Sequence, residues 1–273
     1  LCSEMQDSID LPMRSVSARL GVLGRADGSC HWNQGDTSVI VAIWGPTAPK
    51  RGSNALSDRA FVDIRIIEDI NDNVNQNSNL EGRENPVGLK ADLFNVFKSV
   101  LIDTLHPRCQ ISIVIQVVAD YGSLFSSCIN AVTMALIDAG ISLSGFVTST
   151  TVAIMDKPVS NGAAMSVDGK TEESLFVLDP TAEQASLARS TLTVAWDQRG
   201  RQVLSSYKLN FEKEMPRDAS DQEDHFWNAT ELASKAAAKV LAFQRQTITQ
   251  KILYEGSAGL PSSSAATTKT SSK

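Results

Sequence analysis

The sequence predicts an α+β fold in which mixed β-sheets are packed with helices on one side, and a long C-terminal helix completes a single domain. Strand-like segments come first, followed by a helix, a strand, a helix, further strands and one long helix. Apolar residues make up 42% of the chain, which is enough for a sizeable core. We expect a flexible arm over residues 1–15, the domain over residues 16–254 and a disordered tail over residues 255–273.

The first element is a β-hairpin that follows a strand at Ser17–Leu23. Two turn signals, Ala26–Gly28 and Gln34–Asp36, bracket a short strand that contains Trp32. A β-branched run from Thr37 to Ile43 forms the next strand, and we expect it to stop at Gly45-Pro46. A further β-branched strand is expected at residues 61–67, and polar residues 68–88 form an exposed insertion.

Two amphipathic helices flank the most β-rich run of the sequence. Apolar residues recur at helical spacing over residues 90–103 and again over residues 125–139. Residues 110–118 between them predict a central strand, and Gly140 is placed to end the second helix in a left-handed cap. Small residues on the second helix indicate that another element packs closely against it. The remaining expected elements are strands at 146–155, 175–178, 190–196 and 202–206, a helical turn at 183–188 and a helix at 221–254. A loop is expected at 159–171, and a hairpin turn at 197–200 joins the last two strands.

Charge and cysteine content restrict the class of protein. The net charge is -6 and the pI is about 5.2, so the chain lacks the basic field of a free-standing nucleic-acid binder. The four cysteines are scattered, which fits neither a zinc site nor a disulfide framework and favours a reducing compartment. No apolar run reaches the ~18 residues of a membrane span, and the acidic start does not resemble a signal peptide. The three histidines lie in different elements, so no catalytic triad or metal cluster is expected.

Four stretches resemble the RNase PH family. Residues Arg25–Val39 read Arg-x-Asp-Gly-Ser-x4-Gln-Gly-Asp-Thr-Ser-Val, and residues 115–124, 128–140 and 177–184 match later elements of that family. The resemblance spans roughly Ser17 to Ser206 and implies an RNase PH-like fold. The family contains phosphate-dependent 3′-exonucleases and catalytically silent relatives in the ring of the eukaryotic RNA exosome.

The resemblance locates a phosphate-binding corner that is altered here. Active members carry a Gly-Thr-Arg motif, in which backbone N–H groups at a helix N-terminus hold an anion and the arginine clamps it. This sequence has Gly122, Ser123 and Leu124 at the corresponding positions. Because leucine cannot bind an anion, we expect a poor site for phosphorolysis.

The other functional positions of active members are altered as well. Active members carry two carboxylates on a later strand and turn, and the corresponding positions here are Val177 and Glu183, with Asp179 beside them. Asp179 before a proline is equally well explained as a turn former. Active members also use an arginine-rich segment to grip RNA, whereas this sequence offers only a few cations as candidate RNA contacts, namely Lys50, Arg51, Lys90 and Lys98.

These changes favour a non-catalytic structural subunit of the exosome core ring. The resemblance implies other RNase PH-like subunits as partners in a six-membered ring, together with cap subunits, an associated exoribonuclease and single-stranded RNA, but no membrane. No cofactor and no metal ion is expected, and residence in the nucleus, nucleolus and cytoplasm is implied. Two alternatives remain open, a weak homodimeric metal- or phosphate-dependent nuclease that uses Asp179 and Glu183, and an RNA-binding module that uses Lys50 and Arg51.

Overall fold

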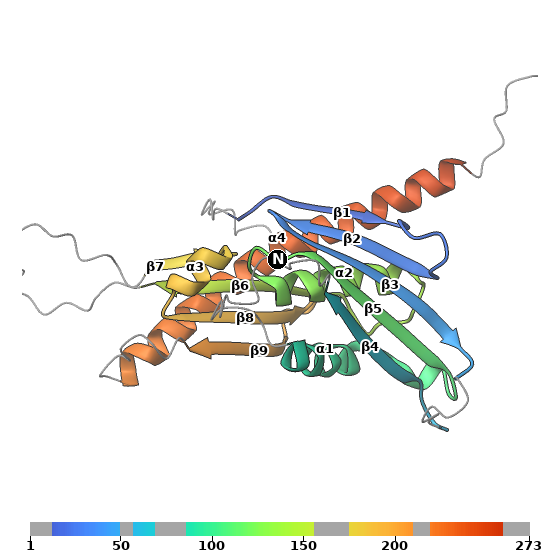
Figure 1. Cartoon of the computed structure of the whole chain (residues 1–273), viewed down its shortest axis with the longest axis horizontal. Helices are drawn as coiled ribbons and strands as arrows, with labels where there is room; N and C mark the ends of the chain where they lie inside the picture. The colour runs from blue at the N-terminus through green and yellow to red at the C-terminus, as the bar shows by residue number, and fades with distance from the viewer. Residues whose placement is uncertain (1–12, 50–56, 69–85, 156–174, 210–218, 259–273) are drawn as a thin grey trace, which may run out of the picture.

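The computed structural model describes residues 13–49, 57–68, 86–155, 175–209 and 219–258, which form two β-sheets and their helices (Figure 1). The expected insertion at 68–88 and the loop at 159–171 lie almost entirely outside the described residues, as do Lys50 and Arg51. No described helix is both long and apolar enough to cross a membrane.

In chain order the elements are β1 Val16–Leu20, β2 Gly28–Gln34, β3 Thr37–Thr47, β4 Phe61–Glu68, α1 Pro86–Val100, a 3₁₀ turn Asp103–Leu105, β5 Gln110–Ala119, α2 Leu124–Asp138, β6 Val147–Met155, β7 Leu175–Leu178, α3 Ala182–Leu187, β8 Ser190–Asp197, β9 Gln202–Leu209 and α4 Ala219–Ala258.

The first sheet is mixed and has the strand order β1-β2-β3-β5-β4. Its strands are antiparallel except for β4, which runs parallel to β5 because α1 carries the chain back across the sheet. Strand β3 does not stop at Gly45-Pro46 as predicted but continues to Thr47. The register shifts between Trp44 and Thr47, so the ladder skips Pro46, which has no N–H to donate.

The second sheet is antiparallel, with the order β7-β6-β8-β9. The predicted hairpin between β8 and β9 is confirmed, since the Gly200 N–H donates to the Asp197 carbonyl at 2.8 Å. Strand β7 pairs with residues 152–155 of β6, and no strand among the described residues pairs with the first half of β6 on that side. The side chain of Asn130 takes that place, because its amide donates to the Ser149 carbonyl and accepts from the Ser149 N–H.

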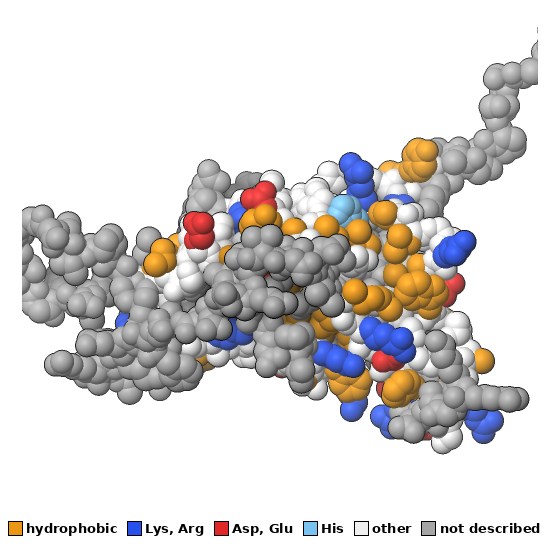
Figure 2. Space-filling model, in the orientation of Figure 1, with side chains coloured by type: hydrophobic (Ala, Val, Ile, Leu, Met, Phe, Trp, Pro, Cys, Tyr) orange, Lys and Arg blue, Asp and Glu red, His pale blue; other side chains and the backbone are white. Residues whose placement is uncertain are grey.

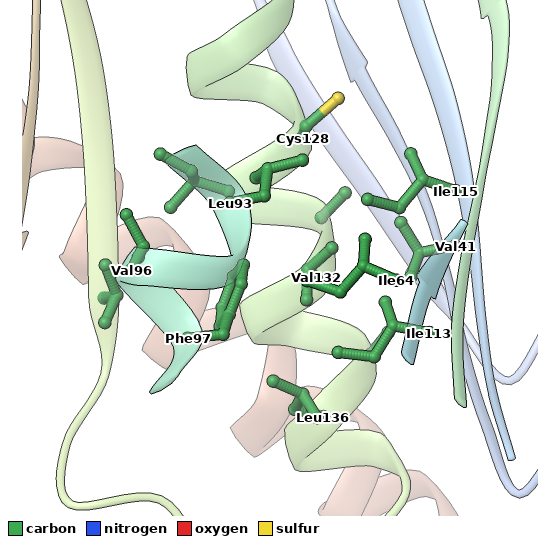
Figure 3. Packing of buried hydrophobic residues seen from close by; sticks show 14 of the residues in the cluster. Val41, Ile64, Leu93, Val96, Phe97, Ile113, Ile115, Cys128, Val132 and Leu136 are labelled. Carbon is green, nitrogen blue, oxygen red and sulfur yellow. The ribbon is translucent and has the colours of Figure 1, made fainter. Parts of the chain in front are cut away.

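Helices α1 and α2 cover the inner face of the first sheet (Figure 3). Alternate residues of β3 and β5 point inward and meet apolar side chains of both helices. The close packing predicted from the small residues of α2 is confirmed at Gly28, where a Cβ would lie 2.3 Å from the Ala139 nitrogen. The fully or almost fully buried residues of this cluster include Val41, Ile64, Leu93, Val96, Phe97, Ile113, Ile115, Cys128, Val132 and Leu136.

Helix boundaries differ modestly from the expected ones. Helix α1 begins at Pro86 and ends at Val100, so the predicted continuation to residue 103 is replaced by the separate 3₁₀ turn. Helix α2 ends as predicted, with Gly140 at φ +68°. Helix α4 packs on β6 and β8 and extends to Ala258, four residues beyond the predicted end. Of the described cysteines, Cys30 and Cys128 are buried, Cys109 is partly exposed, and none forms a disulfide.

Candidate functional site

The first part of the site is the corner where β5 passes into α2. Gly122 has φ +104° and Ser123 has φ +55°, so the chain reverses sharply before Leu124 begins the helix. The Asp120 carboxylate accepts a hydrogen bond from the Gly122 N–H at 3.1 Å, and the Thr37 hydroxyl donates to the Gly122 carbonyl at 2.8 Å. These bonds fix the corner against the start of β3.

The second part is the turn that follows β7. Asp179 has φ +52°, and Thr181 then caps α3 through a capping box with Gln184. The turn lies against the corner, because the Ala182 N–H donates to the Tyr121 carbonyl at 2.9 Å. A Cβ on Gly122 would lie 2.6 Å from backbone atoms of residues 180–182. Two segments more than 50 residues apart in the sequence therefore form one continuous site.

Arg14 joins the two parts. Its Nε and Nη2 donate to the two carboxylate oxygens of Asp179 at 2.8 and 2.5 Å, and Nη2 also donates to the Gly122 carbonyl at 3.1 Å. The Asp179 side chain is only 3% exposed, so its charge is balanced almost entirely by this one arginine. The carboxylate is therefore engaged in an internal ion pair. Sequence reasoning missed Arg14 and placed it in the flexible arm.

Neither Ser123 nor Leu124 offers a positively charged side chain that could bind an anion. Leu124 is buried and belongs to the core cluster between the first sheet and the helices. The Ser123 hydroxyl donates to the Pro180 carbonyl at 3.1 Å and does not cap α2. Gly122, Ser123 and Leu124 themselves thus supply no guanidinium that could clamp an anion at the N-terminus of α2.

The other two expected carboxylate positions are not brought together as a metal site. Val177 lies in β7, half-buried and paired with Ala153 of β6. Glu183 is exposed in the first turn of α3. Among the described residues, no group of three or more His, Cys, Asp or Glu side chains could hold a metal ion.

The comparisons with known proteins decide the family. The RNase PH profile, described as "3′ exoribonuclease family, domain 1", matches residues 12–142. The Schizosaccharomyces pombe exosome complex component ski6 is 30% identical over 239 residues, which cover 83% of this chain and 88% of that protein. This chain belongs to the RNase PH family. Mouse exosome complex component RRP41 is 32% identical over 229 residues, covering 84% of this chain and 83% of that protein.

A solved RNase PH-family structure has the same fold. Rice Rrp46 superposes with a TM-score of 0.66 at 22% identity, and the match covers 87% of this chain and 96% of the rice chain. A curated rice relative, named "Exosome complex exonuclease RRP46 homolog", is 25% identical over 246 residues. The predicted RNase PH-like α+β fold is thus confirmed, and the relatives identify the chain as an RNase PH-family exosome component.

Of the cations proposed to grip RNA, the two that the structure describes, Lys90 and Lys98, do not form one patch. Lys90 and Lys98 are both exposed on α1, but eight residues of helix separate them by about 12 Å. Lys98 lies over the Phe94 ring, 5.7 Å from its centroid, beside a cavity of about 560 Å³. That cavity lies where β4 begins, whereas the corner follows the opposite end of the parallel strand β5. The role of these lysines stays a prediction.

Proposed function

We propose that this RNase PH-family exosome component is a structural subunit of the core ring, which helps form the channel that guides single-stranded RNA to a separate 3′-5′ exoribonuclease. Its neighbours would be other RNase PH-like subunits, with cap subunits on the ring. Within the family, the uncharged corner and the sequence Leu178–Thr181 most resemble exosome component 5. The same resemblance supports residence in the nucleus, nucleolus and cytoplasm.

The main support for this proposal is the side chains found at the corner between β5 and α2. Phosphorolysis needs an anion held against the helix N-terminus, yet Leu124 is buried in the core where active members have an arginine. Next to it, the Asp179 carboxylate is paired with Arg14 on both oxygens, so a metal ion would have to displace an internal guanidinium. Leu124 and Val177 therefore replace two of the charged groups that active members use, while Glu183 is retained.

The charge of the chain supports a role within a complex. At a net charge of -6, a lone chain repels the RNA backbone, so attraction must come from a local patch or from basic neighbours. Within a ring, neighbouring subunits supply that field. The chain then contributes shape to the channel and surfaces for assembly.

The decisive experiment is degradation of a 5′-labelled single-stranded RNA by the purified chain, with and without inorganic phosphate. We expect no phosphate-dependent shortening, and no change on Glu183→Ala. An active RNase PH-family exonuclease assayed in parallel confirms that the RNA and the phosphate are competent. Phosphate-dependent decay that disappears in Glu183→Ala would overturn the proposal.

A second candidate, a weak homodimeric nuclease, draws on two observations. Asp179 and the exposed Glu183 are retained, and one rice relative carries the word exonuclease in its name. This candidate requires cleavage by a purified homodimer that stops on chelation of divalent metal ions. The RNA assay therefore includes an arm with Mg²⁺ and Mn²⁺ and an arm with EDTA, alongside the mass of the chain in solution.

A further inference from the structure

A cavity of about 560 Å³ lies between the second half of α1 and the start of β4, two elements that pack against each other (Figure 1). Ala60 and Leu101 line it and are only 3% and 6% exposed, so the cavity reaches the edge of the core. The Ala60 N–H donates to the Asp103 carbonyl at 3.0 Å, which fixes the 3₁₀ turn after α1 against the start of β4. Regular elements and backbone hydrogen bonds therefore define the walls of the cavity.

Apolar and aromatic side chains form most of the lining. Phe61 and Val62 contribute from β4, and Phe94 contributes from α1, where it remains 36% exposed. Figure 2 shows hydrophobic and positively charged side chains next to one another over α1 and β4. Pockets that bind small molecules are lined mainly by such side chains and have volumes of about 300–1,000 Å³. The cavity is therefore suited to the flat apolar body of a small molecule.

Lys98 supplies a positive charge at the cavity. Its Nζ is held over the Phe94 ring one helical turn earlier, and no described carboxylate forms an ion pair with it. The other cation of the described lining, Arg59, is already engaged, since its Nη2 bonds to Asp58 at 2.8 Å. Of these two cations, Lys98 is thus the one that can pair with an anionic group of a ligand.

The two carboxylates of the described lining limit the charge of that ligand. They belong to Asp58, which is 60% exposed, and to Asp103, which interacts electrostatically with Arg59. A phosphate monoester carries about 1.5 to 2 negative charges and would be repelled by both carboxylates, whereas an organic carboxylate or sulfonate carries a single charge. The lining therefore favours a monoanion over a nucleotide.

We propose that this cavity binds a small aromatic molecule with a single negative charge, whose ring lies against Phe61 and Phe94 and whose anionic group pairs with Lys98. The cavity is separate from the corner between β5 and α2, which follows the opposite end of β5. The inference is therefore independent of the proposed ring membership. A ligand bound there contacts α1, β4 and the 3₁₀ turn together, so its binding stabilises the junction between them.

The first test uses two fluorescent probes that differ in one charged group. Anilinonaphthalene sulfonate carries a sulfonate, and N-phenylnaphthylamine has the same rings without it. Each is titrated into the purified full-length chain, and we expect Lys98→Met to weaken binding of the sulfonate about fivefold and to change binding of the neutral probe by less than about twofold. The matched control Lys90→Met, about two turns earlier on the same helix, is expected to change neither. Equal effects of Lys98→Met on both probes, or no effect on the sulfonate, would overturn the pairing with Lys98.

The second test fills the cavity. Val62→Trp adds an indole ring to the lining, so both probes are expected to bind at least about tenfold more weakly. Val118→Trp, at the far end of β5 where the valine is 47% exposed, adds the same side chain outside the cavity and is expected to retain binding. Unchanged binding of both probes to Val62→Trp, or failure of the wild-type chain to bind either probe, would show that the cavity is not a ligand site.

The third test concerns the class of ligand. Uridine monophosphate is added to the complex of wild-type chain with the sulfonate probe, and we expect it not to displace the probe, because its phosphate meets Asp58 and Asp103. Displacement that Lys98→Met weakens would assign the cavity to a nucleotide and overturn the proposed monoanion. The RNA degradation assay is separate from all three titrations, so a negative result here leaves the proposed function unaffected.

Discussion

At the scale of single residues, Asp179 holds a buried charge, and Arg14 is the one cation that pairs with it among the residues that the structure describes. Both carboxylate oxygens accept from this guanidinium, which also donates to the Gly122 carbonyl of the neighbouring corner. Removal of one member of a buried pair leaves the other charge in a medium that solvates it poorly. The ion pair thus connects the segment before β1 to both halves of the candidate site.

We predict that Arg14→Ala lowers the free energy of unfolding by about 3–5 kcal/mol, measured by urea denaturation, because it leaves Asp179 buried and unpaired. Arg59→Ala, which removes an exposed partner of Asp58, is the control and leaves the midpoint unchanged. The double variant Arg14→Ala/Asp179→Asn recovers much of the loss, since the orphaned charge is gone. Equal instability of the single and double variants would contradict this account.

The Cys30 thiol makes the free energy of unfolding depend on pH in the alkaline range. Burial, and secondarily the Asp138 carboxylate, raise the pKa of the Cys30 thiol from 9.0 to about 12. The unfolded thiol ionises near pH 9 while the folded thiol remains protonated, so its contribution to stability is complete below pH 9 and is lost as pH rises towards 12.

Between pH 8 and pH 10, wild-type chain is therefore expected to lose about 1.4 kcal/mol more unfolding free energy than Cys30→Ala. Urea denaturation of both proteins at the two pH values measures the difference, in which the titration of all other groups cancels. Parallel losses in the two proteins would show that the thiol ionises equally in the folded and unfolded states.

The candidate site could be predicted only in part from the sequence. The turns at Gly122 and Asp179 have recognisable local patterns, and the resemblance to the RNase PH family identified the corner and the turn after β7 as parts of a site. Arg14 was not, because it pairs with a residue 165 positions away and no local periodicity marks it. The one signal was indirect, since an acid that follows a buried strand, as Asp179 follows Leu178, requires a cation from elsewhere.

At the scale of elements, Asn130 fixes α2 against the second sheet. Its amide pairs with both backbone groups of Ser149 at 2.9 and 3.0 Å, on the side of β6 that β7 is too short to reach. The Gln244 side chain of α4 donates to the same Asn130 oxygen at 3.4 Å. One side chain therefore ties two helices to a strand.

Asn130→Leu is expected to lower the free energy of unfolding by about 2–4 kcal/mol, because it keeps the number and branching of the side-chain heavy atoms but leaves two buried backbone groups of Ser149 without partners. Thr133→Val, one turn further along α2 and equally buried, is the control and costs less than about 1 kcal/mol. Its hydroxyl bonds only to a carbonyl within its own helix, Ile129. A similar cost for both variants, measured by urea denaturation, would show that the amide bonds contribute little.

Most helices and strands could be predicted from the sequence, whereas the pairing of each strand with its neighbour in a sheet could not. Periodicity located the strands and helices because each buries one face, as the alternating residues of β5 do. It did not assign strands to two sheets, because the pattern of a half-buried strand is the same beside any partner. The continuation of β3 past Gly45-Pro46 was also missed, since the bulge that accommodates Pro46 depends on β5.

At the scale of the whole molecule, α4 connects the two apolar clusters. Its first half packs against the second sheet through residues such as Ala233 and Ala236. Further along, Val240 is buried in the larger cluster, and the ring of Phe243 meets the edge of Trp32 with 5.8 Å between centroids. Beyond Lys251 the described side chains of the helix are exposed. The helix thus packs against the rest of the fold as far as Lys251 and projects into solvent beyond it.

A chain that ends after Lys251 is therefore expected to unfold at the same urea concentration as the full-length chain. A chain that ends after Leu241 loses Phe243 and the Lys251–Asp138 pair, and should lose at least about 3 kcal/mol of unfolding free energy. Destabilisation of the longer truncated chain would mean that residues 252–273 support the fold.

The strand order of the first sheet has a consequence for synthesis on the ribosome. Strand β3 borders β5, yet Thr47 pairs with Gln110 and Ser38 with Ala119, so the partners are roughly 60–80 residues apart. At about 5–20 residues per second, β3 emerges some 3–15 s before the strand that covers its edge. During that interval the edge of β3 has no strand partner, so its backbone N–H and C=O groups remain open to pairing with another chain until translation has delivered β5.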